Sequence, residues 1–217
     1  MKRFDSILVA NRGEIACRVL RSAKTLGYKT VAIYSDPDAN APHVHLADQA
    51  FRVGPGPVSE SYLEHEAVIN AALDSGAGAI HPGYGFLSEN AAFAEACNDK
   101  GLIFIGPTSE AIAIMGDKAQ SKRRVLDVQV PCIPGYQGKD QTDSAFVNAS
   151  SEIEFPIMIK AAAGGGGRGM RQIDSPDQLI NGLALARAEA KSAFGSDTLI
   201  LEKVIKSPRH IEIQIFA

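Results

Sequence analysis

The 217-residue sequence lacks the features of several protein classes. It has no apolar run near the roughly 18 residues of a membrane-spanning helix, and its start lacks the apolar stretch of a signal peptide. A formal net charge of −3 provides no basic excess for nucleic acid. Its three cysteines have no Cys-x-x-Cys spacing, which excludes a disulfide framework, and Cys17 and Cys97 fall in helical patterns as packing groups. We therefore expect a cytoplasmic globular protein with no nucleic-acid or membrane partner.

Familiar phosphate-binding and catalytic patterns are also missing. The turn after the first expected strand has one glycine, Gly13, where a dinucleotide-binding domain has Gly-x-Gly-x-x-Gly. Gly164 and Gly169 have the Walker A spacing, but Met-Arg follows them instead of Lys-Ser/Thr. No Ser-His-Asp or Cys-His constellation can be placed from spacing, so nucleophilic catalysis has no support.

Strand and helix patterns alternate over the first hundred residues. Short apolar runs predict strands at 6–10, 30–34, 50–53, 79–80 and 103–105. Helical patterns lie between them, at 15–26, at 61–73 behind a Ser61/Glu64 capping box, and at 90–99. Repeated strand–helix units imply a parallel sheet covered on both faces, so we expect a doubly wound α/β first domain.

A second, α+β region begins near residue 108. Its expected elements are helices at 109–115, 117–126, 144–149 and 176–193, and strands at 157–160, 170–173 and 198–202. Residues 210–215 alternate apolar and polar side chains, which predicts a last, half-buried strand. Nothing later in the sequence covers its apolar face, so we expect a chain truncated within a longer protein.

The glycine tract at 164–169 is the strongest local motif, with five of the 20 glycines. Glycines let backbone N–H groups converge on phosphate oxygens, whereas a hairpin needs only roughly two to five turn residues. We therefore favour a phosphate-binding loop over a structural hairpin. Lys160 ends the preceding apolar strand and can place its ammonium beside the same phosphates.

Other polar groups are ambiguous from the residues alone. Glu202 ends an apolar strand and could bind an adenine edge, but strands ending in Glu-Lys are common, so the residues alone favour an ordinary strand end. The loop at 81–90 follows a strand end, where α/β proteins bind ligands, and a structural turn is equally compatible. His43, His45 and Asp48 are too few for a closed metal site and fall in an expected surface turn.

In combination, these motifs resemble biotin carboxylases, the ATP-grasp components of acyl-CoA carboxylases and of pyruvate carboxylase. The matching segments, in order, are 7–16 (ILVANRGEIA), 81–90 (HPGYGFLSEN), 115–118 (MGDK), Lys160 with the glycine tract, and 208–212 (PRHIE). The resemblance covers essentially the whole chain. It implies an N-terminal, pre-ATP-grasp domain and part of an ATP-grasp domain, with these bounds: 1–115 for the first, then a helical linker at 116–131, a lid at 132–204 and the first strand of the main sheet at 205–217.

The resemblance implies a reaction and its partners. Biotin carboxylases use ATP, Mg²⁺ or Mn²⁺, and bicarbonate to form carboxyphosphate, and they transfer its carboxyl group to biotin on a carrier protein. A carboxyltransferase is the further partner, as in fatty-acid metabolism, and the family often forms homodimers. The family's metal-binding glutamates and its bicarbonate- and biotin-binding residues lie beyond the position matching Ala217. We therefore expect no catalytic residue here and no turnover by these residues alone.

The resemblance also assigns nucleotide contacts. Lys118 and Lys160 would contact the ATP phosphates, and Gly166 and Gly167 would cover those phosphates from the lid. The nucleoside would lie against five residues near the end of the lid, in these roles: Glu202 and the backbone of Lys203 and Ile205 on adenine, Val204 lining its pocket, and His210 approaching the ribose.

Two other hypotheses stay open at this point. One is another ATP-grasp ligase, such as a carbamoyl phosphate synthase, which shares part of the motif at 81–90; residues 10–16 favour the biotin enzymes instead. The other is a non-catalytic nucleotide-binding or assembly module, against which the exposed last strand argues, because an uncovered strand invites aggregation.

Overall fold

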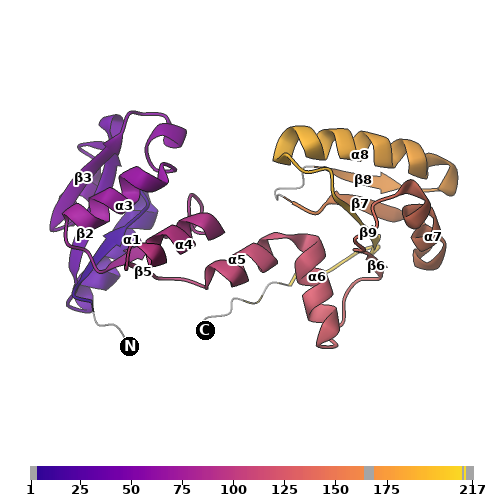
Figure 1. Ribbon diagram of the computed structural model, residues 1–217, viewed down its shortest axis with the longest axis horizontal. Helices are drawn as coiled ribbons and strands as arrows, with labels where there is room; N and C mark the ends of the chain where they lie inside the picture. Colours follow the sequence, from indigo (N-terminus) through magenta and orange to yellow (C-terminus); the bar gives the residue numbers. More distant parts are fainter. Residues whose placement is uncertain (1–3, 164–168, 212, 214–217) are drawn as a thin grey trace. The chain divides into compact units, whose positions relative to one another are not determined.

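The computed structural model divides the chain into two compact units, Met1–Ala113 and Ile114–Ala217. It describes residues 4–163, 169–211 and 213 (Figure 1). No helix among these described residues is long and apolar enough to cross a lipid bilayer.

The first unit is built on a parallel sheet with the strand order β3-β2-β1-β4-β5. The strands are β1 (Ser6–Val9), β2 (Lys29–Ser35), β3 (Gln49–Gly54), β4 (Ala79–His81) and β5 (Ile103–Phe104). The chain winds outward from β1 to β3 and then returns to add β4 and β5 on the other side of β1. The carboxyl ends of β1 and β4 are therefore neighbours at the point where the winding changes direction.

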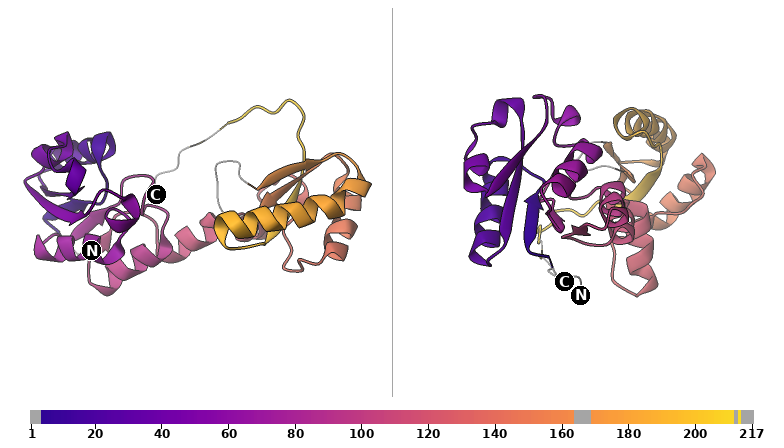
Figure 2. Two further views of the ribbon diagram at one scale, coloured as in Figure 1. Left: turned by 90° about the horizontal axis from the view of Figure 1, so that it is seen from above. Right: turned by 60° about the vertical axis from the view of Figure 1, so that its left-hand side comes forward.

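Helices cover both faces of this sheet (Figures 1 and 2). On one face, Val9 and Ala32 pack with residues of α1 (Gly13–Thr25) and α2 (Pro42–Leu46). On the other face, Leu8 and Ile33 belong to the larger core formed with α3 (His65–Asp74) and α4 (Ala91–Asp99). Neighbouring strand residues thus face opposite layers, and the prediction of a doubly wound α/β unit is confirmed.

The second unit contains an antiparallel sheet with the order β6-β9-β7-β8. Its strands are β6 (Gly135–Tyr136), β7 (Ile157–Ala161), β8 (Met170–Ile173) and β9 (Leu199–Lys203). Its core is formed with α7 (Asp143–Ile153) and α8 (Leu179–Phe194), which pack on one face of the sheet. Residues of the opposite face pack against α6 (Lys118–Asp127), which follows α5 (Ser109–Gly116). This arrangement agrees with the α+β architecture expected for the second region.

The strand expected at 210–215 is absent from the part of this segment that the structure describes. His210, Ile211 and Ile213 lie in no strand, and the other residues of the segment are outside the described residues. Ile211 and Ile213 are 69% and 79% exposed. Alternation predicts a strand only where a neighbouring strand supplies hydrogen bonds and a layer covers the apolar face, and the side chains of Ile211 and Ile213 are largely uncovered.

Two local predictions are also wrong, and one short strand has no counterpart among the predicted elements. The capping box fails because the Ser61 hydroxyl donates to the carbonyl oxygen of Pro57, and α3 begins only at His65. The surface turn around His43 is instead the short helix α2, in which the His43 side chain is fully buried and donates to the carbonyl oxygen of Ile33. The two-residue strand β6 is too short for periodicity to reveal.

Candidate functional site: a lysine-rich pocket

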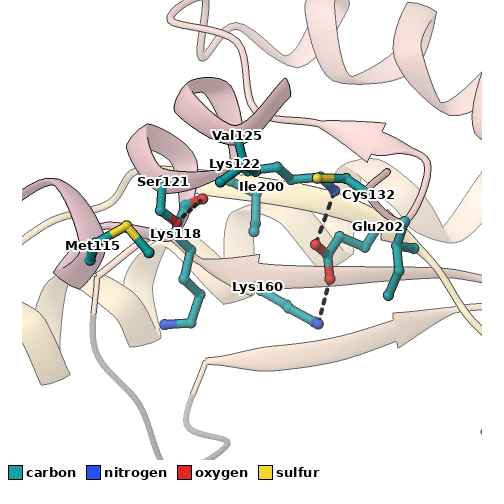
Figure 3. Close-up of a pocket in the computed structure, with 10 residues that line it drawn as sticks. Met115, Lys118, Ser121, Lys122, Val125, Cys132, Lys160, Ile200 and Glu202 are labelled. Carbon is teal, nitrogen blue, oxygen red and sulfur yellow. Dashed lines mark hydrogen bonds and ion pairs between the residues drawn. The ribbon is translucent and has the colours of Figure 1, made fainter. Parts of the chain in front are cut away.

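A pocket of about 360 Å³ lies in the second unit, between α6 and the sheet (Figure 3). This volume lies within the range of small-molecule sites in proteins. Three lysines and one glutamate line it, so the pocket has a cationic surplus suited to an anionic ligand. Its ten lining residues are Met115, Lys118, Ser121, Lys122, Val125, Cys132, Ile133, Lys160, Ile200 and Glu202.

Helix α6 supplies one wall of this pocket. It begins at Lys118 because the carboxylate of Asp117 accepts a hydrogen bond from the backbone N–H of Gln120 at 2.8 Å, a standard N-cap. The backbone N–H of Lys118 also donates to the carbonyl oxygen of Ala162 at 3.0 Å, which ties the helix start to the end of β7. Lys118 and Lys122 are four residues apart and therefore lie on the same face of the helix.

Strands β7 and β9 supply the opposite wall through the period-two alternation of strand side chains. Ile159 and Leu201, which are paired across the two strands, point into the core of the unit. Their sequence neighbours Lys160 and Glu202 therefore point to the other face, into the pocket. The same alternation that builds the core thus places a lysine and a glutamate at the site.

Glu202 is the shared partner of two lysines. Its Oε1 accepts a hydrogen bond from Lys122 at 3.0 Å, and its Oε2 accepts one from Lys160 at 2.5 Å (Figure 3). Burial opposes ionisation of the carboxyl group, but the hydrogen bonds from Lys160 and Lys122 outweigh it and lower the pKa of Glu202. Glu202 is therefore an anion held between two cations.

Lys122 is the member of this group that sequence reasoning missed. It is buried, and its partner is 80 residues away along the chain. Only its spacing of four residues from Lys118 on one helix face could have suggested it. Its pairing with β9 is a tertiary contact that local pattern does not reveal.

The structure brings Lys118, Lys160 and Glu202 together in the pocket, but not the other predicted site residues. The Lys203 ammonium points away from it and pairs with Glu154 at 2.7 Å, and the Lys203 backbone N–H donates to the carbonyl oxygen of Pro134. The pocket is also not lined by the three predicted site residues that come after β9, namely Val204, Ile205 and His210. Gly166 and Gly167 lie outside the described residues.

A second group of predicted residues lies in the first unit, where β1 and β4 end. The Asn11 side-chain amide donates to the carbonyl oxygens of Pro82 and Tyr84, at 2.9 and 3.0 Å. Asn90 ends this loop by accepting a hydrogen bond from the N–H of Phe93, which caps α4. These contacts join the two loops that carry the motifs at 7–16 and 81–90.

The described residues contain no group of three or more His, Cys, Asp or Glu side chains that could hold a metal ion. The carboxylate of Asp48 accepts hydrogen bonds from Lys24 and Thr30. These bonds lower the pKa of Asp48 to about 2.

The comparisons with known proteins agree with this fold. Residues 3–112 match the family described as biotin carboxylase, N-terminal domain, and residues 117–217 match the carbamoyl-phosphate synthase L chain, ATP binding domain. The chain is 51% identical over 214 residues to the mitochondrial methylcrotonoyl-CoA carboxylase subunit alpha of Glycine max, covering 99% of this chain and 29% of that protein. It is 50% identical over 215 residues to the biotin carboxylase of Nostoc sp., covering 99% of this chain and 48% of that protein.

A solved structure shares the fold. The biotin carboxylase domain of the 2-oxoglutarate carboxylase of Hydrogenobacter thermophilus, a dimer in complex with MgADP, ADP and bicarbonate, matches with a TM-score of 0.87 and 46% identity. That match covers 95% of this chain and 45% of the solved chain. The doubly wound first unit and the antiparallel second unit therefore define the ATP-grasp class of protein.

Within that class, the first unit distinguishes the family. The second unit matches an ATP-binding domain named for carbamoyl-phosphate synthase, but the first matches biotin carboxylases. The chain belongs to the biotin carboxylase family. It spans about three tenths of the carboxylase subunit and about half of the biotin carboxylase that it matches.

Proposed function

We propose that this chain binds ATP as part of a biotin carboxylase. The observation that carries the proposal is the pocket in which three lysines and one glutamate converge, with Lys160 near the end of β7 and the glycine tract beginning at Gly164, shortly after that strand. Lysine ammonium groups and glycine N–H groups are the donors that phosphate oxygens require. The bound ADP of the Hydrogenobacter neighbour supports the same ligand class.

Within this proposal each predicted site residue has one role. Lys118 and Lys160 bind the phosphates, while Gly166 and Gly167 cover them from a lid at 132–204. Four residues near the end of β9 bind the adenosine, in these roles: the backbone of Lys203 and Ile205 on adenine, Val204 against its ring and His210 near the ribose. Glu202 lies at the junction of these two groups and binds the adenine edge.

The proposed reaction has two steps. Bicarbonate attacks the γ-phosphorus of ATP, which releases ADP and forms carboxyphosphate. The carboxyl group then passes to the ureido nitrogen of biotin on a carrier, and phosphate leaves. Mg²⁺ would neutralise phosphate charge in the first step. The lid would exclude water, which would otherwise hydrolyse the intermediate.

The proposed partners follow from this reaction. They are a biotin carboxyl carrier protein or domain, a carboxyltransferase that receives the carboxyl group, and a second copy of the protein in a homodimer. We propose the cytoplasm as its location. We also propose that the N-terminal domain ends at residue 115 and that the ATP-grasp domain begins after it.

Cys132 offers a direct test of nucleotide binding because its thiol lines the pocket. Cys17 and Cys97 are buried, and burial raises the pKa of Cys97 to about 12, so a thiol reagent reaches Cys132 first. We expect MgADP at millimolar concentration to slow alkylation of Cys132 several-fold, and Lys160→Ala to raise the half-protecting concentration by about tenfold. Mass spectrometry of the intact chain measures both.

Lys191→Ala is the matched control, because Lys191 is exposed on α8 and does not line the pocket. It should leave protection unchanged. Adenosine should protect much less than MgADP if the lysines bind phosphate. Absence of any MgADP protection in the wild-type chain would overturn the proposed nucleotide site.

The carboxylation itself is testable in a chimera. The aligned part of the Nostoc biotin carboxylase is replaced by these 217 residues, which match it over 99% of their length. We expect ADP formation that requires both bicarbonate and biotin, and a loss of at least about a hundredfold in kcat/KM with Lys160→Ala. ADP formation that is indifferent to biotin would contradict the proposed reaction and leave only a nucleotide-binding module.

A further inference from the structure

The two lysines that bind Glu202 differ in their access to solvent. Lys122 donates to Oε1 at 3.0 Å and its side chain is 9% exposed, while Lys160 donates to Oε2 at 2.5 Å and is 27% exposed. Each carboxylate oxygen thus has its own lysine. Lys122 is the enclosed partner, and Lys160 is the partner that a ligand in the pocket can reach.

A glycine on the neighbouring strand makes room for the enclosed lysine. Gly135 pairs with Glu202 in the ladder between β6 and β9. A Cβ atom at Gly135 would lie 2.9 Å from Nζ of Lys122 and 2.2 Å from the backbone oxygen of Leu201. The ammonium of Lys122 is therefore held between α6, β6 and β9, in a space that exists because residue 135 has no side chain.

We propose that Lys122 is a positioning residue of the nucleotide site, which keeps Glu202 ionised and paired while Lys160 moves from Glu202 to a nucleotide phosphate. The inference rests on the proposed function, since it requires phosphate beside Lys160. When Lys160 leaves, Oε2 loses its lysine but Oε1 keeps a charge-assisted hydrogen bond from Lys122. Without Lys122 the same movement would leave a buried carboxylate with no lysine, which is strongly unfavourable.

The surroundings of Glu202 give this role a distinct pH dependence. The titratable groups that face it in the pocket are Lys118 and Lys122 of α6, Cys132 of the segment before β6, and Lys160 of β7. In a Lys122→Met variant, Lys160 can leave without penalty only if Glu202 takes up a proton. Nucleotide binding by that variant should therefore strengthen as the pH falls, relative to the wild-type chain.

The test measures the MgADP concentration that half-protects Cys132 from alkylation, at pH 8 and at pH 6. We expect Lys122→Met to raise this concentration about tenfold at pH 8 and by about threefold or less at pH 6. Lys122→Arg, which retains the positive charge, should restore most of the wild-type affinity. In the Glu202→Gln background, Lys122→Met should have no further effect, because no carboxylate remains to be held.

Different results would overturn different parts of the account. Equal half-protecting concentrations for Lys122→Met and wild type at both pH values would overturn the role of Lys122 alone. A loss that is the same at both pH values and persists in the Glu202→Gln background would show a structural role instead. If Lys122→Met does not fold, Lys122→Gln carries the same test, since its amide can donate to Oε1 without a charge. No protection of the wild-type chain would overturn the proposed function itself.

Discussion

Replacing Glu202 with alanine is expected to lower the free energy of unfolding of the second unit by about 3 kcal/mol. Glu202 is 14% exposed, and it is the shared partner of Lys122 and Lys160. Its removal leaves the buried ammonium of Lys122 without that carboxylate and places two lysines near each other across the pocket. Urea unfolding followed by circular dichroism measures the loss, since the chain has no tryptophan for fluorescence.

Glu154 provides a matched control. It also pairs with a lysine, Lys203, at 2.7 Å, but its side chain is 74% exposed. Water solvates both partners of this pair, so Glu154→Ala should change stability little. If Glu154→Ala and Glu202→Ala lowered the free energy of unfolding by similar amounts, burial of the Glu202 ion pairs would not increase their contribution to stability, contrary to the geometry.

The contribution of Glu202 should also depend on pH in one direction. Burial alone would raise its pKa, but the hydrogen bonds from Lys160 and Lys122 lower it below the ordinary value of 4.5. A carboxyl group with a lowered pKa stabilises the folded state above its unfolded pKa, and this stabilisation is lost as the pH falls through the folded value. The difference between wild type and Glu202→Ala should therefore be constant above about pH 5.5 and shrink below about pH 4.5.

Phe146→Ala is the second change with a large expected effect, a loss of about 3–5 kcal/mol from the free energy of unfolding. Phe146 is fully buried in the core of the second unit. Its ring makes an edge contact with Tyr136 at 5.2 Å between centroids, and the Arg187 guanidinium carbon lies 5.3 Å from the ring centre. Truncation would leave a cavity and remove both ring contacts.

The neighbouring residue serves as the control for this change. Val147 follows Phe146 on α7 but is 41% exposed, so Val147→Ala should cost less than about 1 kcal/mol in urea unfolding. Phe146→Ala should also weaken nucleotide binding, because Tyr136 belongs to β6, whose other residue, Gly135, is next to Lys122. A loss below about 1 kcal/mol for Phe146→Ala would contradict the packing described for this core.

Local pattern was sufficient for the main elements and for part of the site. The apolar run of β1 and the helical stripe of α1 predict the doubly wound first unit, since each element shows its own period. The position of Lys160 at the end of an apolar strand predicts its place in the pocket. In both cases the information is contained within a few consecutive residues.

The remainder depends on contacts between distant residues. The connection of Lys122 to the site is visible only from its hydrogen bond to Glu202. Likewise, β6 exists as a strand only because β9 pairs with it. His43 is buried and hydrogen-bonded to the carbonyl oxygen of Ile33. Its position directly after a proline in a polar segment is, by contrast, typical of a surface turn. His210, Ile211 and Ile213 show the converse, because these described residues lie in no strand despite the strong alternation of their segment.

The alternation of β7 and β9 has a consequence for how this site can vary. Leu201 and Glu202 are adjacent in sequence, yet one contributes to the core and the other to the pocket. A shift of β9 by one residue against its neighbours would bury a carboxylate in the core and place a leucine among the lysines. The register of this strand is thus selected twice, by apolar burial on one face and by charge pairing on the other. An insertion or deletion within it would remove stability and ligand binding together, whereas single substitutions can change either one alone.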